Sequence, residues 1–340
     1  MAATLRIARA SELNQVTSFI KQNWRRDHVF VRRPELLMWQ HLNKKEETLN
    51  FIVAAESAEI VGLLGFIPFR RFDESLKENT IALAVWKVIK EAGGGTGVML
   101  LNQLVADFKP TTTIGIGLSD MVVPIYRALR FSTGVMEHFA IFHPDLEVSQ
   151  ITGQNVKQNK TAATPMKVIG RSLDLEESLL IKLEAMLRAN TPEKSVAYYR
   201  ERFERHPSFL YLMIVLGRGK DPELLLVLRE VQVKGSFLVR VVDVGGDVSL
   251  LPQCASVLSE LIKDRGAEYL DLVMTGVDSN EMLRNGFTCT RTDTDLVLPN
   301  YFDPFEKRTV NVAYALKSSL RESQKLHLHP SDTDQDRPNS

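Results

Sequence analysis

The residues of this sequence that most directly suggest a chemistry are four glycines within five positions, in the stretch AGGGTG at residues 92–97. The apolar spacing that follows predicts a helix over residues 98–108. The first N–H groups of a helix have no partner within the helix and carry a partial positive charge, so they bind phosphate well. Glycine costs conformational entropy but lets a ligand come close to the backbone. The loop therefore predicts a site for a phosphate-bearing ligand.

Two common phosphate-binding motifs do not fit this loop. A P-loop needs Lys-Ser/Thr after its last glycine, whereas Val98 and Met99 follow Gly97 here. A Rossmann fingerprint needs a third glycine three residues after the second, and from Gly95 and Gly97 that place is held by Leu100. What remains is a strand, a Gly-x-Gly loop, a helix, a strand and a short helix that carries a tyrosine.

At these positions the sequence resembles the GNAT superfamily of acyl-CoA-dependent N-acyltransferases, over about residues 4–145. In that family a loop of pattern Gln/Arg-x-x-Gly-x-Gly/Ala holds the coenzyme A pyrophosphate. Gly95 and Gly97 occupy the glycine places, and Ala92 stands where the family has Gln/Arg. The family's Tyr-x-x-Leu-Gly-Phe motif is matched by YRALRF at residues 126–131, with Arg in place of Gly, and the turn before it is Ser-Asp without the family's Asn.

The resemblance implies an acyl-CoA thioester as co-substrate, either acetyl-CoA or a longer acyl-CoA. Backbone N–H groups of a splayed strand beside residues 86–88 would bind the thioester oxygen, and Tyr126 would protonate the departing thiolate. A tyrosine that only packs the short helix is the alternative. The residues that the resemblance assigns to the cofactor are Trp86, Lys87, Val88, Gly93, Gly94, Gly95, Thr96, Gly97, Val98, Ser119 and Tyr126.

The general base is open among His28, His41, His138 and Glu137. A single histidine, or water relayed to one, could deprotonate an amine whose pKa is close to neutral. His138 comes first, because the closing strand of such a fold borders the acceptor site. His28 comes second, because it lies in the loop between the first two predicted helices. A surface or packed histidine is the ordinary alternative for each.

The whole chain also resembles a narrower group, the tandem-GNAT enzymes that acylate nucleotide-linked amino sugars for bacterial surface polysaccharides. The stretches that carry this resemblance are NWRRDHVF, ELLMWQHL, LLGFIPFRRFD, ALAVWKV and LPNYFDPF. Arginine suits phosphate, so the local arginines could bind a nucleotide diphosphate, although a solvated basic loop would have the same composition. The acceptor residues expected on this basis are Trp24, Arg25, Arg26, His28, Arg70 and Arg71.

The elements around these residues predict an α/β (α+β) chain of two tandem GNAT-like domains, each a mostly antiparallel mixed sheet flanked by helices. The first half ends with a closing strand at residues 134–142, and the second half repeats the same order of elements up to a strand at 310–316. The predicted boundaries are 1–147 for the catalytic domain, 148–165 for a polar linker, 166–318 for the second domain and 319–340 for a disordered tail. The second glycine loop, at 244–249, carries acidic residues that would repel pyrophosphate, so this copy is expected to be degenerate.

The composition excludes several other classes of protein. The 340 residues have a net charge of +0, which gives no reason to expect nucleic acid as a partner. The absence of a signal segment or long apolar stretch predicts a cytoplasmic protein without a membrane partner. Neither the two cysteines nor the histidines and carboxylates show metal-ligand spacing, so no metal is expected.

The sequence therefore predicts an enzyme that moves an acyl group from acyl-CoA to the amine of a nucleotide-linked amino sugar by direct attack on the thioester. The chain could also acylate another small amine or a protein, or bind coenzyme A without catalysis. A homodimer is possible.

Overall fold

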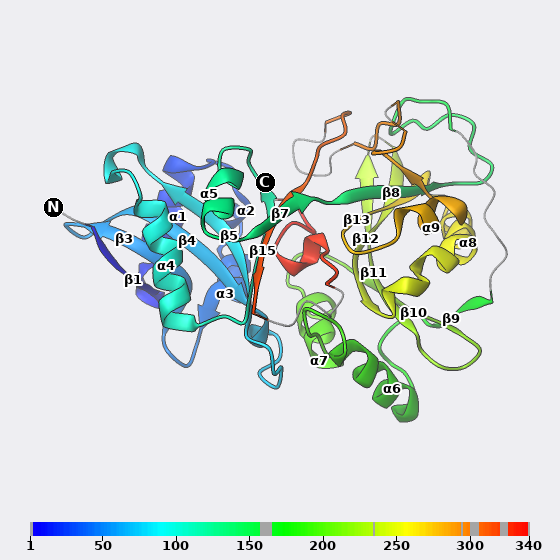
Figure 1. Cartoon of the computed structure of the whole chain (residues 1–340), viewed down its shortest axis with the longest axis horizontal. Helices are drawn as coiled ribbons and strands as arrows, with labels where there is room; N and C mark the ends of the chain where they lie inside the picture. Colours follow the sequence, from blue (N-terminus) through cyan, green and yellow to red (C-terminus); the bar gives the residue numbers. More distant parts are fainter. Residues whose placement is uncertain are drawn as a thin grey trace.

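The computed structural model describes residues 3–156, 165–233, 235–293, 295–299, 306–319 and 326–338. The chain forms two lobes that lie side by side, each built around one mixed sheet (Figure 1). This arrangement confirms the predicted α/β class with two mostly antiparallel sheets flanked by helices.

The sheet of the first lobe is antiparallel except at one pair of strands. Its strands run in the order β1-β3-β4-β5-β6-β15-β7, with β2 added to β3, and only β5 and β6 are parallel. These strands are β1 (Thr4–Arg9), β2 (Leu42–Asn43), β3 (Thr48–Glu56), β4 (Glu59–Pro68), β5 (Thr80–Val88), β6 (Thr112–Leu118), β7 (Ser132–Val135) and β15 (Ala313–Ser318).

Helices cover both faces of this sheet because its central strands are apolar on both sides. Along β3, Phe51 and Val53 join the core under the first three helices, whereas Ile52 and Ala54 join the core under the glycine-loop helix. The helices on the first face are α1 (Leu13–Asn23), α2 (Val29–Arg32) and α3 (Pro34–His41). Those on the second face are α4 (Thr96–Phe108) and α5 (Val123–Ala128).

The second lobe repeats this plan with a sheet of order β14-β8-β13-β12-β11-β10-β9, in which only β12 and β13 are parallel. Its strands are β8 (Glu137–Phe142), β9 (Met166–Gly170), β10 (Leu212–Arg218), β11 (Leu224–Val233), β12 (Ser236–Gly246), β13 (Tyr269–Met274) and β14 (Thr288–Cys289). Its helices are α6 (Glu177–Arg188), α7 (Val196–Tyr199), α8 (Ala255–Arg265) and α9 (Ser279–Arg284).

The two halves of the chain exchange a strand, which corrects the predicted domain boundaries. The predicted closing strand over 134–142 breaks at Met136, and its second part, β8, pairs with β13 in the second sheet. In return β15 lies between β6 and β7 in the first sheet. The boundaries 1–147 and 166–318 therefore each assign one strand to the wrong sheet, because sequence spacing does not reveal which sheet a strand joins.

The C-terminal segment is also different from the prediction. Disorder over 319–340 is wrong for residues 326–338, where Ser331, Asp336 and Arg337 are almost fully buried. Figure 1 shows this red segment between the two lobes. The first part of the predicted linker is packed as well, since the Ile151 N–H donates to the buried Glu268 carboxylate at 3.0 Å.

The described helices are all too short or too polar to cross a membrane.

Candidate active site

The cleft that holds the expected chemistry opens where β5 and β6 diverge. The two parallel strands pair only from Thr80 to Ala82 on β5, although β5 continues to Val88 and β6 to Leu118. Beyond that point residues 83–86 and 115–119 line the two sides of a cavity of about 480 Å³. On β5 the register with β4 shifts between Leu83 and Trp86, which leaves one extra residue on the cleft side. Such a bulge exposes backbone groups that could bind a carbonyl oxygen.

Of the three residues expected to face the thioester, only Trp86 lines this cleft. Lys87 and Val88 pair with Leu63 and Gly62 of β4. The Trp86 indole also packs against the glycine loop. A Cβ placed on Gly97 would lie 3.3 Å from the Trp86 Nε1.

The glycine loop forms an open approach to the N-terminus of α4. Gly93 and Gly95 have φ angles of 82° and 91°, in the left-handed region that favours glycine. A Cβ added to Gly93, Gly94 or Gly95 would meet no atom of the described chain within 4 Å. The buried Thr96 turns its hydroxyl to the carbonyl of Ala92 at 2.6 Å, which holds the turn. The first N–H groups of α4, from Thr96 to Val98, have no carbonyl of their own helix to bond, so they can bind an anion.

Tyr126 lies on α5 and lines the cleft. Its ring packs edge-on against Trp86, with centroids 5.5 Å apart, and a Cβ on Gly115 would be 3.4 Å from its hydroxyl. The side chain is 1% exposed, and its burial raises the pKa of the phenol well above 10. The phenol therefore stays protonated throughout the physiological range. Ser119, at the end of β6, lines the same cleft.

The predicted acceptor residues separate into two groups. Trp24, Arg25 and His28 line the cleft of Tyr126, and Trp24 is 47% exposed. Arg25 also pairs with Asp27 at 2.7 Å.

Arg26, Arg70 and Arg71 do not line the cleft. Arg26 is exposed, and Arg70 donates to the carbonyls of Leu76 and Lys77. Arg71 donates to the carbonyl of Trp39 at 2.6 Å. Arg70 thus holds a loop and Arg71 a helix, and the expectation that these arginines gather on an acceptor diphosphate is not supported.

His28 faces the cleft, but in a form that does not suit a base. Its Nδ1 accepts the N–H of Phe30 at 3.2 Å, so the proton of the neutral ring is on Nε2. Burial lowers the pKa of His28 to about 4, which keeps the ring neutral. His28 can therefore donate a hydrogen bond to a ligand, but it has no lone pair left to accept a proton.

His138, the first choice for the base, lies in the second sheet as a result of the strand exchange. Its Nε2 is 3.0 Å from the Asp271 carboxylate, which also accepts two hydrogen bonds from Arg240. All three side chains are buried, and none lines the cleft. The Arg240 guanidinium and His138 hold the pKa of Asp271 below its usual range. This triad lies inside the second lobe and takes no part in lining the cleft. His41, the third histidine considered, is fully buried and bonds the Phe66 carbonyl at 3.1 Å.

Several residues of the cleft come from positions that the sequence did not single out. Among them, Val310, Asn311 and Val312 precede β15, and Asp334 and Gln335 belong to the C-terminal segment. Gln335 approaches β6 closely, since a Cβ on Gly117 would be 2.6 Å from its Oε1. The sequence signal for this segment was weak, because its polar composition resembles that of a disordered tail.

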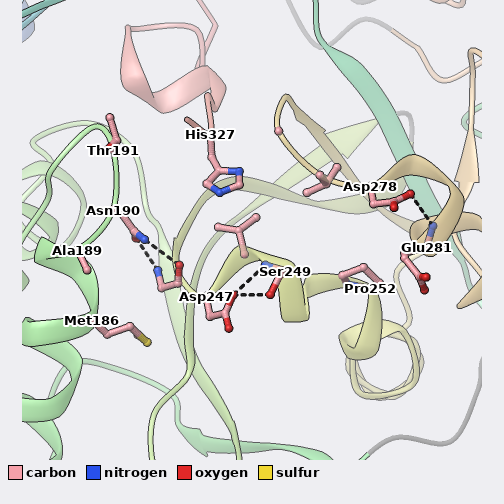
Figure 2. Close-up of a pocket in the computed structure, with 14 residues that line it drawn as sticks. Met186, Ala189, Asn190, Thr191, Asp247, Ser249, Pro252, Asp278, Glu281 and His327 are labelled. Carbon is pink, nitrogen blue, oxygen red and sulfur yellow. Dashed lines mark hydrogen bonds between the residues drawn. The ribbon is translucent and has the colours of Figure 1, made fainter. Parts of the chain in front are cut away.

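The second lobe has its own cavity, of about 580 Å³, at the corresponding place in its sheet. Figure 2 shows Asp247 turned toward Ser249 there, and its carboxylate accepts the Ser249 N–H at 3.2 Å. Asn190 bridges the N–H and carbonyl of Gly246, at 2.7 and 2.8 Å. The chain's own carboxylate thus occupies the position where the first lobe leaves open N–H groups, and a pyrophosphate would meet its charge.

Asp243, His329 and Asp332 are close enough together to consider a metal site. However, the Lys194 ammonium lies 2.5 Å from Asp243 and 2.8 Å from Asp332. This buried lysine already supplies the positive charge that the two carboxylates need.

Comparison with known proteins supports the fold. No protein-family model and no curated protein matches the sequence. A GCN5-related N-acetyltransferase from Anabaena variabilis matches the structure with a TM-score of 0.57 at 10% identity, over 93% of this chain and 72% of that one. A putative acetyltransferase from Pyrococcus horikoshii matches with a TM-score of 0.51 at 10% identity, over 97% and 94%.

A third match is the GCN5-related glucosamine N-acetyltransferase region of a fungal multi-domain β-N-acetylglucosaminidase. Its TM-score is 0.52 at 13% identity, over 93% of this chain and 38% of that one. The fold of the chain is therefore that of GCN5-related N-acetyltransferases, as the resemblance implied.

Proposed function

We propose that the chain is an N-acyltransferase that uses an acyl-CoA thioester. Two observations carry this proposal. The divergence of β5 from β6 and the buried phenol of Tyr126 lie at one cleft, and the Trp86 indole in the wall of that cleft lies next to the open loop before α4. The loop would hold the pyrophosphate through the first N–H groups of α4. The thioester would then extend between the two strands toward Tyr126.

In this proposal the reaction is a direct transfer. Backbone N–H groups at the bulge of β5 would stabilise the negative charge that develops on the thioester oxygen. A neutral amine attacks the carbonyl carbon, the C–N bond forms and the C–S bond breaks. The amine nitrogen loses one proton to a base or to solvent, and Tyr126 gives its proton to the sulfur and recovers one from solvent.

The acceptor in this proposal is a small amine, and an amino sugar is the first candidate. The fungal match, a glucosamine N-acetyltransferase region, favours this class. Arg25 is the only arginine among the described residues that line the cleft, which favours an acceptor without a diphosphate. A nucleotide-linked amino sugar of a polysaccharide pathway is the alternative acceptor. We infer a cytoplasmic location on the ground that acyl-CoA is available there.

The second lobe would not bind coenzyme A in this scheme, since Asp247 fills the helix N-terminus that a phosphate would need. Its proposed role is to complete the first lobe with β15 and the C-terminal segment. Whether the chain forms the homodimer considered above stays a prediction.

Two measurements on the purified chain test this function. Acetyl-CoA or a longer acyl-CoA should raise the melting temperature, and thiol release should follow when an amine is added. The amine panel should contain glucosamine, a UDP- or dTDP-linked amino sugar, a polyamine and an amino acid. Stabilisation without thiol release from any amine would favour a coenzyme A-binding protein without catalysis. Absence of stabilisation by every acyl-CoA would contradict the proposal.

A further inference from the structure

Asp334 is the only carboxylate among the described residues that line the cleft of Tyr126. The residue is 3% exposed, so its charge is largely removed from bulk water. A carboxylate in such a place is costly unless it is bound by cations or hydrogen-bond donors. The contacts of Asp334 therefore indicate what it is available to bind.

The direct contacts of Asp334 are weak for a buried carboxylate. Gln335 Nε2 donates to its Oδ1 at 3.0 Å, while Gln40 Nε2 is 3.5 Å and Arg337 is 3.8 Å from its Oδ2. The same C-terminal segment contains two tighter ion pairs, Asp332 with Lys194 at 2.8 Å and Asp336 with Arg202 at 2.7 Å. An ionised carboxylate has about four acceptor sites, so Asp334 can accept further donors from a ligand in the cleft.

Two glycines of β6 serve as reference points for the positions of Tyr126 and Asp334. The Tyr126 hydroxyl lies over Gly115, and Gln335, which bonds Asp334, lies over Gly117. Gly115 and Gly117 are two residues apart on β6, so the two side chains reach neighbouring points of one strand. Tyr126 and the Asp334–Gln335 pair thus flank the same stretch of the strand.

The segment that carries Asp334 is held rigidly from both lobes. Arg337 donates to Gln40 of α3 at 2.6 Å, and Tyr211 of the second lobe donates to Asp336. A side chain fixed in this way can be held in a productive geometry without further ordering when a ligand binds.

The geometry points to Asp334 as the residue that binds the amine of the acceptor and takes its proton as the amide forms. This inference rests on the proposed function. The neutral amine gives up one proton to the Asp334 carboxylate as its lone pair forms the C–N bond. The C–S bond breaks, and the sulfur takes the proton of Tyr126. Asp334 then returns its proton to solvent. His28, whose Nε2 carries a hydrogen, would donate to another group of the acceptor.

The test compares Asp334→Asn with the unmodified chain, using the amine that releases thiol best. Asp107→Asn, an exposed carboxylate on α4 away from the cleft, is the matched control. We expect D334N to lower kcat about 10²- to 10⁴-fold, as loss of a general base does, with the Kd for acyl-CoA changed less than threefold. Asp334→Glu, which keeps the carboxylate, should recover part of the lost kcat. A D334N variant that binds acyl-CoA and keeps kcat within threefold would overturn the inference and leave the proposed function intact.

A second measurement on the unmodified chain covers the case in which D334N does not fold. An alcohol analogue of the acceptor, with hydroxyl in place of the amino group, should bind at least tenfold more weakly than the amine, because the ammonium is attracted to the carboxylate. Equal binding of the two would overturn the inference. Failure of the unmodified chain to bind any acyl-CoA would instead overturn the proposed function itself.

Discussion

Replacing Tyr126 with phenylalanine removes the proton donor of the proposed reaction and little else. The ring keeps its edge-on contacts with Trp86 and Phe131, at centroid distances of 5.5 and 5.0 Å. Among the described residues no hydrogen-bond partner of the Tyr126 hydroxyl is found, so the folded chain loses no bond. We therefore expect the free energy of unfolding to change by less than about 1 kcal/mol.

The catalytic effect of the same change should be much larger. Loss of a general acid typically lowers kcat about 10²- to 10⁴-fold, or about 3 to 5 kcal/mol of barrier. The Kd for acyl-CoA should stay within about threefold, because the loop and α4 hold the cofactor. Because burial raises the pKa of Tyr126 well above 10, the phenol keeps its proton up to pH 9. The ratio of wild-type to variant kcat should therefore be the same at pH 7 and pH 9.

Steady-state thiol release at these two pH values measures this ratio, and calorimetry measures acyl-CoA binding. Tyr314→Phe is the control, since Tyr314 lies on β15 of the same sheet and outside the cleft lining. A Y126F variant whose kcat falls less than threefold, with the fold intact, would refute the assignment of Tyr126 as the acid. A ratio that falls steeply between pH 7 and pH 9 would refute the argument about its proton.

Three further predictions follow from the loop, the buried histidines and the exchanged strands. A Cβ on Gly94 meets no atom within 4 Å, so Gly94→Ala should leave the melting temperature unchanged. The same methyl group would keep the phosphates from the loop backbone, so acyl-CoA binding should weaken about tenfold by calorimetry. An unchanged Kd would contradict the phosphate site. Burial lowers the pKa of His28 to about 4 and of His41 and His206 to about 3, so below pH 6.5 the unfolded chain binds protons that the folded chain does not. Urea unfolding should thus show stability falling from pH 7 to pH 5, by at most about 1.4 kcal/mol per pH unit for each histidine, and a flat profile would argue against their burial. Fragments 1–156 and 165–340 should each fail to fold alone and should recover acyl-CoA binding when co-expressed; a lone first fragment that melts cooperatively and binds acyl-CoA would contradict the exchange.

Local elements could be read from the sequence because each depends on nearby residues. The helix predicted after the glycine loop is α4, and the strands predicted around it are β5 and β6. β5 lies in the middle of its sheet, between β4 and β6. In the glycine loop, Gly93 and Gly95 adopt left-handed backbone angles, which favour glycine.

The exchange of β8 and β15 could not be read in the same way. Both strands are apolar and of ordinary length, and either could pair in either sheet by pattern alone. Met136 separates β7 from β8 without a glycine or proline to mark a break. An apolar run without a break favours one continuous strand, so a single strand is predicted over 134–142, whereas the structure divides it between the two sheets.

The acceptor side of the cleft was the least predictable part of the site. Arg70 and Arg71 attract attention by local composition, yet each bonds a backbone carbonyl. Asp334 lies in a polar segment whose burial depends on ion pairs with Arg202 and Lys194, far from it in sequence. Composition alone treats such a segment as solvated, because it cannot reveal charge partners that only the fold brings together.

The exchange of strands also explains why a second lobe without an open phosphate site would still be needed. β15 lies directly beside β6, so the residues that precede it, Asn311 and Val312, become part of the cleft wall. The C-terminal segment then adds Asp334 and Gln335 to the same wall. The first lobe supplies the loop, α4 and Tyr126, and the end of the chain supplies the side on which an acceptor would lie. A substitution in the second half that loosens this segment should therefore weaken binding of the acceptor before it weakens binding of acyl-CoA. The two halves of the site can then be distinguished by these kinetic effects rather than by their positions in the sequence.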